Sequence, residues 1–332
     1  MSDRSDGDDR IRQARPEDYE TVVAFTENTW PGRGEDYIPR IYHDWIANDG
    51  EDQRTFVIEH QGTVAGICQA VALTEYEAWA QGMRVDPAHR GKGLSGPLNE
   101  ALFDWAAARG AAVCRNMVFS WNAAGLGGAR AAGFEPCTEF RWAHPEPNTE
   151  TEPDLTVRED PDAAWSYWQR SDAREELRGL TLDSGESWAL SALTRADLHR
   201  AAEEQRVFSV HDGGTRGLAY RVREYEREVR SSEDENDGNE SESETNDTDD
   251  RDESNPETER WAEYGIGAWA DVESARSLFR AIAADAAALD ADRTRVLLPE
   301  TPRHVSDAAV CRVETSAEPD FVLEIDLTDR MD

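Results

Sequence analysis

The sequence predicts a mixed α/β fold in which one unit of strands and helices is used twice along the chain. Stretches with strand-like alternation of apolar residues are interspersed with stretches of helical apolar spacing in both halves. A strand, a glycine turn and a second strand begin at Phe56, and the same pattern recurs at Phe208. The polar, proline-spaced segment 145–153 separates the halves, and 332 residues suffice for two domains. We therefore expect two α/β units, each with a mixed sheet.

In the first half, the expected order is βααβββαβαβ. Pro16 lies where a first helix would begin, and Gly110 follows the longest helical pattern, as is common at helix ends. The turn at Gly62 joins two strands as a hairpin. The expected elements are Ile11–Ala14, Glu17–Glu27, Tyr37–Ile46, Thr55–His60, Thr63–Leu73, Glu77–Val85, Ser95–Arg109, Ala111–Ser120, Asn122–Ala132 and Phe134–Trp142.

The second half is expected to repeat this order, with an unrelated α+β domain as the open alternative. Segment 231–259 has 14 acidic residues, one arginine and no apolar side chain, so we expect a disordered insertion. After the hairpin come Trp261–Trp269, Asp271–Leu289, Thr294–Leu298 and Phe321–Leu327. The expected division is a disordered tail at 1–10, a first domain at 11–145, a linker at 146–154 and a second domain at 155–330.

The charge of the chain excludes two classes of partner. With 70 acidic against 35 basic residues, the net charge of −35 argues against binding to nucleic acid or to an anionic membrane surface. Lys92 is the only lysine. Such a surface resembles that of proteins from salt-accumulating (halophilic) cells, where salt screens the repulsion between carboxylates. Because neither an apolar leader nor a membrane-spanning apolar run is found, we expect a cytoplasmic protein.

The cysteines give no sign of a metal site. They are Cys68, Cys114, Cys137 and Cys311, which are far apart in sequence and lack CxxC spacing. We expect buried free thiols.

The most informative stretch is the loop that follows the expected strand ending at Val85. It runs Arg90-Gly91-Lys92-Gly93-Leu94-Ser95 into the next helix. Successive N–H groups at a helix start form an anion site, glycines let a phosphate approach the backbone, and the basic side chains add charge. The presence of the only lysine in this loop favours a functional role.

Two familiar phosphate-binding patterns fit this loop poorly. GxxxxGK[ST] fails because Asp86 and Gly93 stand where glycine and serine or threonine are required. GxGxxG is matched by Gly91, Gly93 and Gly96. A dinucleotide fold, however, would place that pattern directly after its first strand and an acidic residue about 20 positions on. Hairpin strands precede it here, and position 116 is asparagine.

A third pattern fits best. Val85-Asp-Pro-x-x-Arg90-Gly-x-Gly93-x-Ser95 resembles the R/Q-x-x-G-x-G/A pyrophosphate signature of the GCN5-related N-acetyltransferase (GNAT) family. The resemblance covers residues 11–142 and includes the order of elements and Asn122…Gly133-Phe134 after the fifth strand. It implies that acetyl-CoA, or another acyl-CoA, binds where the fourth and fifth strands separate. The implied cofactor-binding residues are Met83, Val85, Arg90, Gly91, Lys92, Gly93, Leu94, Ser95 and Asn122.

The reaction that this resemblance implies is attack of an amine on the thioester, with an N–H of the fourth strand stabilising the oxyanion. Because the amine must be neutral, a general base is useful, and Glu77 is the candidate. A solvated glutamate at a strand start is the alternative for Glu77. Many relatives carry a tyrosine general acid where this chain has Ala129, so the thiolate would be protonated by another group.

In this family's fold, the acceptor amine is expected to approach between the late strands and the loop that joins the first two helices. That loop contains Trp30, Arg33, Asp36 and Tyr37. Arg33 would hold a carboxylate and Asp36 an amine, which suits a small amino acid. The alternative is helix capping by Asp36 and packing by the two aromatic residues.

The second half lacks the glycine loop and has Asp271 and Glu273 at the corresponding helix start. Carboxylates there cap a helix and repel phosphate, so we expect a degenerate GNAT-like copy. The expected function is metal-free N-acetyltransfer from acetyl-CoA to a primary amine of a small molecule or amino acid. The alternatives are a non-catalytic acyl-CoA-binding or sensing module and an NAD(P)-linked oxidoreductase. The sequence does not indicate an oligomeric state.

Overall fold

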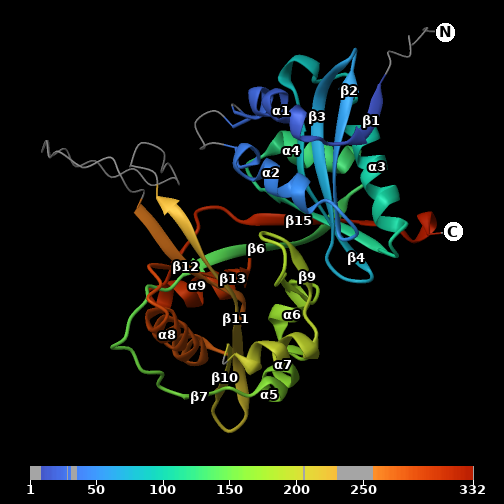
Figure 1. The fold of residues 1–332 in the computed structure, drawn as a ribbon. Helices are drawn as coiled ribbons and strands as arrows, with labels where there is room; N and C mark the ends of the chain where they lie inside the picture. Colours follow the sequence, from blue (N-terminus) through green and yellow to red (C-terminus); the bar gives the residue numbers. More distant parts are fainter. Residues whose placement is uncertain (1–8, 28, 31–35, 205, 230–256, 332) are drawn as a thin grey trace, which may run out of the picture. The chain divides into compact units, whose positions relative to one another are not determined.

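The computed structural model describes residues 9–27, 29–30, 36–204, 206–229 and 257–331. The chain divides into two compact units, each with helices packed on a sheet (Figure 1). Unit 1 comprises residues 1–137 and 322–332. Unit 2 comprises residues 138–321.

Unit 1 contains the elements that the sequence predicts for the first half, with bounds that differ by a few residues, except that most of the predicted last strand belongs to unit 2. Pro16 opens a 3-10 turn that leads into the first helix. The elements are β1 (Arg10–Gln13), η1 (Pro16–Asp18), α1 (Tyr19–Thr26), α2 (Ile38–Asn48), β2 (Gln53–His60), β3 (Thr63–Ala72), β4 (Glu77–Val85), η2 (Pro87–His89), α3 (Ser95–Ala107), β5 (Val113–Phe119), α4 (Ala123–Ala131), most of β15 (Asp320–Asp326) and η3 (Thr328–Arg330).

The strands of unit 1 follow the order β1-β2-β3-β4-β5-β15. Neighbours from β1 to β4 are antiparallel, whereas β4 and β5 are parallel. The sheet is therefore mixed, as predicted.

Helices cover both faces of this sheet. Val22 of α1, Tyr42 of α2 and Ile67 of β3 belong to one buried cluster. Leu98 of α3 instead lies against Gly66. A Cβ added to Gly66 would be 3.1 Å from Leu98 Cδ1. Successive strand residues point to opposite faces. The neighbours Gly66 and Ile67 therefore put α3 on one face and the α1–α2 pair on the other.

Unit 2 repeats the strand order of unit 1 and the directions of its first five strands. Its order is β7-β10-β11-β12-β13-β6, with β12 and β13 parallel and the other neighbours antiparallel. The elements are the later part of β6 (Glu135–His144), β7 (Thr156–Arg158), α5 (Pro161–Trp168), α6 (Asp172–Glu176), β8 (Leu180–Leu182), β9 (Leu190–Ala192), α7 (Arg195–Glu203), β10 (Val207–His211), β11 (Thr215–Val229), β12 (Glu257–Trp269), α8 (Val272–Ala288), β13 (Arg293–Pro299), α9 (Pro302–Val310) and β14 (Glu314–Thr315).

The last strand of each unit comes from the other half of the chain. β6 pairs with β13 of unit 2, in the register Val296↔Ala143 to Pro299↔Phe140. β15 follows β5 in the strand order of unit 1. Figure 1 draws β15 in red. This arrangement differs from the sequence prediction, in which Phe134–Trp142 closes the first domain and Phe321–Leu327 the second. Alternation of apolar residues predicts a strand but not its partner, because ladder hydrogen bonds join backbone groups.

Two predicted disordered segments are shorter than expected where the structure describes them. Residues 230–256 of the acidic segment lie outside the described residues, but residues 257–259 belong to β12 and pair with β11 up to Val229. A backbone ladder can continue past the apolar residues, since it needs no apolar side chain. Residues 1–8 of the tail also lie outside the described residues, and Arg10 begins β1.

The prediction of free cysteines is confirmed. Cys68, Cys114 and Cys137 are buried, and Cys311 is half-buried. Burial raises the pKa of the Cys68 and Cys114 thiols well above its usual range.

Among the described residues, no helix combines the length and the apolar character needed to cross a bilayer.

Candidate functional site

The loop between β4 and α3 enters the helix through two glycines with left-handed backbone. Gly91 has a φ of +75° and Gly93 a φ of +82°, values that other residues rarely adopt. A Cβ added at either glycine would meet nothing within 4 Å, so the space beside the loop is open. Asp86 fixes the preceding turn, since it accepts a hydrogen bond from the Ala88 amide at 2.8 Å.

The backbone amides of residues 91–95 are the main chemical feature of this loop. Within the described part of the chain, none of them donates to an acceptor. They lead into α3, whose first turn carries no acidic side chain. Unpaired amides and the positive end of the helix dipole both favour an anion at this position. The arrangement can therefore bind a phosphate.

Two basic side chains surround these amides. Arg90 is exposed and has no ion-pair partner among the residues that the structure describes. Lys92 Nζ lies 3.5 Å from Nε2 of His60, at the β2–β3 turn, and His60 Nδ1 lies 2.6 Å from Asp9. Positive charge is thus concentrated beside the loop in an otherwise acidic chain.

β4 and β5 separate next to this loop. Their parallel pairing runs from Glu77↔Val113 to Trp79↔Arg115, and no later pair is formed in the described chain. The amide of Asp86 donates to Ala65 O of β3 at 2.9 Å. Backbone groups alternate in direction along an antiparallel strand, so those of Val85 point toward the β5 side. The open edge of β4 can bond to an extended ligand.

The other two residues predicted to contact the cofactor are partly engaged by the protein itself. Met83 O accepts a hydrogen bond from Arg84 Nη1 at 3.1 Å. Asn122 caps α4, and its Oδ1 accepts a hydrogen bond from the Gly125 amide at 2.9 Å. This capping bond leaves the side-chain NH2 of Asn122 as the group that could reach a ligand.

Glu77, the predicted base, starts β4 at the end away from the glycine loop. Its carboxylate accepts hydrogen bonds from Arg115 Nη1 at 2.6 Å and from Thr74 Oγ1 at 3.2 Å, and the residue is 8% exposed. Glu77 is therefore not the solvated glutamate of the alternative interpretation. The rise of a strand puts it about 26 Å from Val85. Burial, the ion pair and this distance favour a structural role, and a catalytic role for Glu77 stays a prediction.

Asp36 forms a buried ion pair with Arg84 instead of presenting its carboxylate to a ligand. Arg84 Nε donates to Asp36 Oδ2 at 2.6 Å, and the Ile38 amide donates to Oδ1 at 3.0 Å. The Asp36 side chain is 0% exposed. The guanidinium carbon lies 4.4 Å from the ring centre of Trp30 and 5.6 Å from that of Tyr37. This differs from the prediction that Asp36 holds an amine, and it agrees with the capping and packing alternative.

Sequence reasoning missed three residues of this region, Arg84, Phe119 and Trp121. The Trp30 ring meets Phe119 edge-on at 5.9 Å and Trp121 at 5.8 Å, and the latter two rings stack at 5.1 Å. Trp121 is next to the predicted residue Asn122, which was a usable signal. Nothing in the sequence links Arg84 to the α1–α2 loop. Arg33 lies outside the described residues.

A comparison with models of protein families identifies the family to which this part of the chain belongs. Residues 13–134 match the model described as the acetyltransferase (GNAT) family. Residues 13–134 form a GNAT domain. The matched range includes β2 to β5, the glycine loop and α4. No curated protein matches the chain.

Solved structures that match nearly the whole chain include two with TM-scores above 0.5. One is a GCN5-related N-acetyltransferase from Sphaerobacter thermophilus, with a TM-score of 0.58, 11% identity and coverage of 96% of this chain and 96% of that one. The other, from Thermoplasma acidophilum, is provisionally described as an acetyltransferase. It has a TM-score of 0.52 and 15% identity, and it covers 96% of this chain and 99% of that one. At these identities the likeness is one of fold, and it includes unit 2 as well as the GNAT domain.

Unit 2 has a carboxylate where the GNAT domain has its glycine loop. Asp271 caps α8, as predicted, by accepting a hydrogen bond from the Ser274 amide at 2.9 Å, and it pairs with Arg216. Burial raises the pKa of Asp271, but the bonds from Ser274 and Arg216 outweigh it and lower the pKa to about 2. An ionised carboxylate thus neutralises this helix start.

The space between β12 and β13 of unit 2 is filled by the protein. Their pairing ends at Tyr264↔Val296. Just beyond, Gly265 O accepts a hydrogen bond from Thr181 Oγ1 at 2.6 Å. A Cβ on Gly267 would lie 2.9 Å from Leu298 Cδ2, which indicates close packing.

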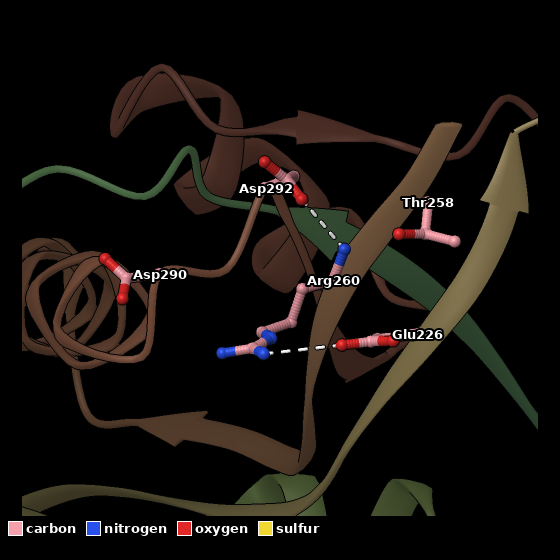
Figure 2. Close-up of a pocket in the computed structure, with 5 residues that line it drawn as sticks. All are labelled: Glu226, Thr258, Arg260, Asp290 and Asp292. Carbon is pink, nitrogen blue, oxygen red and sulfur yellow. Dashed lines mark hydrogen bonds and ion pairs between the residues drawn. The ribbon is translucent and has the colours of Figure 1, made fainter. Parts of the chain in front are cut away.

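A shallow cavity lies elsewhere in unit 2 and contains none of the predicted site residues. Figure 2 shows Arg260 at its centre, with its side chain 3.3 Å from Glu226 and its backbone N 2.8 Å from Asp292. A further Arg260 nitrogen donates to Leu289 O at 3.0 Å. The basic group of the cavity is therefore held by the protein. The lining residues are Glu226, Thr258, Arg260, Asp290 and Asp292.

Proposed function

We propose that the GNAT domain binds acetyl-CoA and transfers its acetyl group to the primary amine of a small molecule or amino acid. The observation that carries this proposal is the run of amides 91–95, which have no acceptor in the described chain and stand beside the separation of β4 from β5. A diphosphate supplies the missing acceptors. The adjacent strand edge suits the extended, amide-containing arm of CoA.

The residues present fit this co-substrate. The left-handed Gly91 and Gly93 leave open space above the amides, so a diphosphate can approach the backbone without meeting a side chain. We assign the diphosphate to Arg90, Gly91, Lys92, Gly93, Leu94 and Ser95, the pantetheine arm to the backbone of Met83 and Val85, and a further contact to the Asn122 amide.

Acetyl-CoA supplies a thioester whose carbonyl carbon the neutral amine attacks, so that the C–N bond forms, the C–S bond breaks, and the thiolate and the amine proton leave as the thiol. The chain contributes orientation of both reactants and an N–H of the open β4 edge for the oxyanion. Because Glu77 lies in a buried ion pair, this proposal gives it no proton transfer, and the amine proton reaches the thiolate directly or through water.

The acceptor approaches on the α1–α2 face in this proposal. Trp30, Tyr37 and Arg84 line that face near the ends of β4 and β5. The Arg84 guanidinium keeps N–H groups beyond those bonded to Asp36 and Met83. Those donors, rather than Asp36, are the groups suited to a carboxylate-bearing amine.

We further propose that unit 2 is a degenerate copy of the same fold that does not bind acetyl-CoA. The repeated strand order supports this, as do the Asp271 cap and the filled space around Gly267. One molecule of CoA per chain is then expected in a calorimetric titration, and two would contradict this proposal. The excess of acidic over basic residues in the whole chain leads us to place the protein in the cytoplasm of a salt-accumulating cell.

Thermal shift in molar KCl tests the proposal most simply. Acetyl-CoA should stabilise the protein and NADPH should not. Arg90→Glu should weaken acetyl-CoA binding about ten- to hundred-fold, the worth of a hydrogen bond to a charged group. Arg40→Glu, a charge reversal at another exposed arginine of unit 1, is the matched control and should leave binding unchanged. An unchanged response in Arg90→Glu would overturn the assignment of the loop.

Turnover separates the enzyme from a sensing module. Incubation with acetyl-CoA and a library of polar amines, followed by mass spectrometry, should reveal an N-acetylated product and free CoA. Tight CoA binding without any product would support a non-catalytic module instead. Stabilisation by NADPH but not by acetyl-CoA would support an oxidoreductase.

A further inference from the structure

A chain of polar side chains crosses three strands of unit 1 on the α1–α2 face. Gln81 Nε2 donates to Gln69 Oε1 at 2.7 Å, and Gln69 Nε2 donates to Thr55 Oγ1 at 3.1 Å. Thr55 Oγ1 in turn donates to Asp49 Oδ1 at 3.0 Å. The three strand residues are direct cross-strand partners in β2, β3 and β4. Asp49 is the residue that follows α2.

Burying these polar side chains costs free energy unless their hydrogen bonds are made. Gln69 and Thr55 are 0% exposed, on the face where Val57 and Ile67 pack against α1 and α2. Each bond of the chain is therefore needed, and each member fixes the orientation of the next.

The donor and acceptor roles in this series of hydrogen bonds follow from the carboxylate of Asp49, at the end opposite to Gln81. An ionised carboxylate only accepts, so the Thr55 hydroxyl donates its hydrogen bond to Asp49. Asp49 also accepts from the Thr55 amide and from Gln13 Nε2, both at 2.9 Å. With its one proton committed, the Thr55 oxygen accepts from Gln69. Gln69 must then accept from Gln81. This order assigns the amide nitrogen of Gln81 to the sheet interior and its carbonyl oxygen to the other side.

Gln81 lies where β4 has left β5. Trp79 is the last β4 residue paired with β5, and Gln81 is two positions further along the strand. Gly82 follows with a φ of +65° in an irregular stretch of the β3–β4 ladder, and Trp45 packs against it. The Gln81 side chain is half-buried. It is therefore near the separation of the strands, unlike Glu77, which lies where the strands are still paired.

We propose that Asp49, acting through Thr55 and Gln69, orients the Gln81 side chain so that its carbonyl oxygen accepts a hydrogen bond from the N–H of the attacking amine. Gln81 takes no proton; it aims the nitrogen lone pair at the thioester carbonyl carbon. Asp49, Thr55 and Gln69 are positioning residues. The inference rests on the proposed acetyltransfer function and names the group that orients its acceptor.

The surroundings of Asp49 give the chain a pH dependence. Burial raises the pKa of Asp49, hydrogen bonds from Thr55 and Gln13 and the charge of Arg54 on β2 lower it, and the net shift is upward. Tyr42 of α2 also faces it, and burial raises the pKa of that phenol. Protonation of Asp49 in acid removes the acceptor-only end of the chain, and the orientation of Gln81 is then no longer fixed.

The test uses Thr55→Val, which removes the hydroxyl at nearly constant volume. Thr55→Ser restores the hydroxyl and is the rescue variant. Thr26→Val is the matched control, since Thr26 is a buried threonine of α1 whose hydroxyl, among the described residues, donates to the helix carbonyls of Val22 and Val23. We expect Thr55→Val to lower kcat/KM about ten-fold for the amine that turns over fastest in the library, with the KM for acetyl-CoA unchanged. Thr55→Ser and Thr26→Val should behave like the unmodified protein.

A second readout needs no turnover. The side-chain NH2 resonances of Gln81, assigned by their loss in Gln81→Leu, should move as Asp49 titrates in acid, and Thr55→Val should abolish that movement. Equal kinetics in Thr55→Val and Thr26→Val, or Gln81 resonances that ignore Asp49, would overturn the inference alone. Binding of acetyl-CoA without acetylation of any amine would overturn the proposed function and this inference with it.

Discussion

The ion pair between Glu77 and Arg115 yields a prediction about how unit 1 is held together. Arg115 of β5 donates to Glu77 of β4 at 2.6 Å and to Glu324 of β15 at 3.1 Å. One guanidinium thus joins two strands from the first half of the chain to the strand from its end. The Arg115 side chain is 14% exposed and that of Glu77 is 10% exposed. Although burial lowers the pKa of Arg115, Glu77 and Glu324 raise it overall.

Arg115→Met keeps the length of the side chain and removes its charge. Glu77 then loses the guanidinium that pairs with its buried carboxylate, a loss that typically costs about 3–5 kcal/mol of unfolding free energy. Glu77→Gln leaves Arg115 paired with Glu324, so we expect a smaller cost of about 1–2 kcal/mol. In the double variant the buried Glu77 carboxylate and its counter-ion are both removed, and only the partly exposed Glu324 loses its partner, so the two costs should fall short of additivity by about 2 kcal/mol.

Native-state hydrogen exchange of peptides covering β4 and β5 measures this cost within unit 1, where a whole-chain melt would mix the two units. The measurement belongs in molar KCl, so that the screening of the acidic surface is constant. Additivity of the two single variants within about 0.5 kcal/mol would refute the reasoning. It would mean that Glu77 is not held by Arg115, and Glu77 would return as a candidate base.

Other predictions follow from the same structure. Deleting residues 320–332 removes β15 from unit 1, so exchange protection of β5 and stabilisation by acetyl-CoA should both be lost; retention of either would contradict the placement of this strand. Gly93→Val forces a branched residue to a φ of +82° and should weaken CoA binding by at least ten-fold in a calorimetric titration, whereas Gly62→Ala, in the β2–β3 turn, should leave it unchanged. The Asp271 pKa is lowered to about 2, so the stability that this group contributes is present above its ordinary pKa and is lost as pH falls toward 2. Asp271→Asn should remove that part of the acid dependence of unit 2, as followed by hydrogen exchange of α8. With a net charge of −35, the melting temperature should rise by about 10 °C between 0.1 and 2 M KCl, and a flat salt response would contradict the halophilic interpretation.

The glycine loop could be predicted from the sequence because its chemistry is local. Left-handed backbone at Gly91 and Gly93, a helix start at Ser95 and a strand end at Val85 all depend on neighbouring residues. The β2–β3 hairpin and β4 were predicted for the same reason.

The partners of β6 and β15 could not be predicted, because a strand pairs through backbone groups that are the same in every sequence. Either strand satisfies the alternation expected of a last strand. Local patterns therefore do not encode which unit each of these strands joins.

The roles of Asp36, Glu77 and Gln81 were also hidden, and for a different reason. A carboxylate in the sequence looks the same whether it is exposed or paired. Only the fold shows that Asp36 is held by Arg84 and that Glu77 is held by Arg115. Gln81 was overlooked because an amide is not a base, and its link to Asp49 requires three strands in register.

An experimental structure of the chain with CoA tests the central claim most directly. We predict that diphosphate oxygens lie within hydrogen-bonding distance of the amides of residues 91–95 and that the pantetheine arm follows the open edge of β4. A CoA molecule bound in unit 2, or one whose diphosphate contacts only side chains away from Gly91 and Gly93, would contradict it.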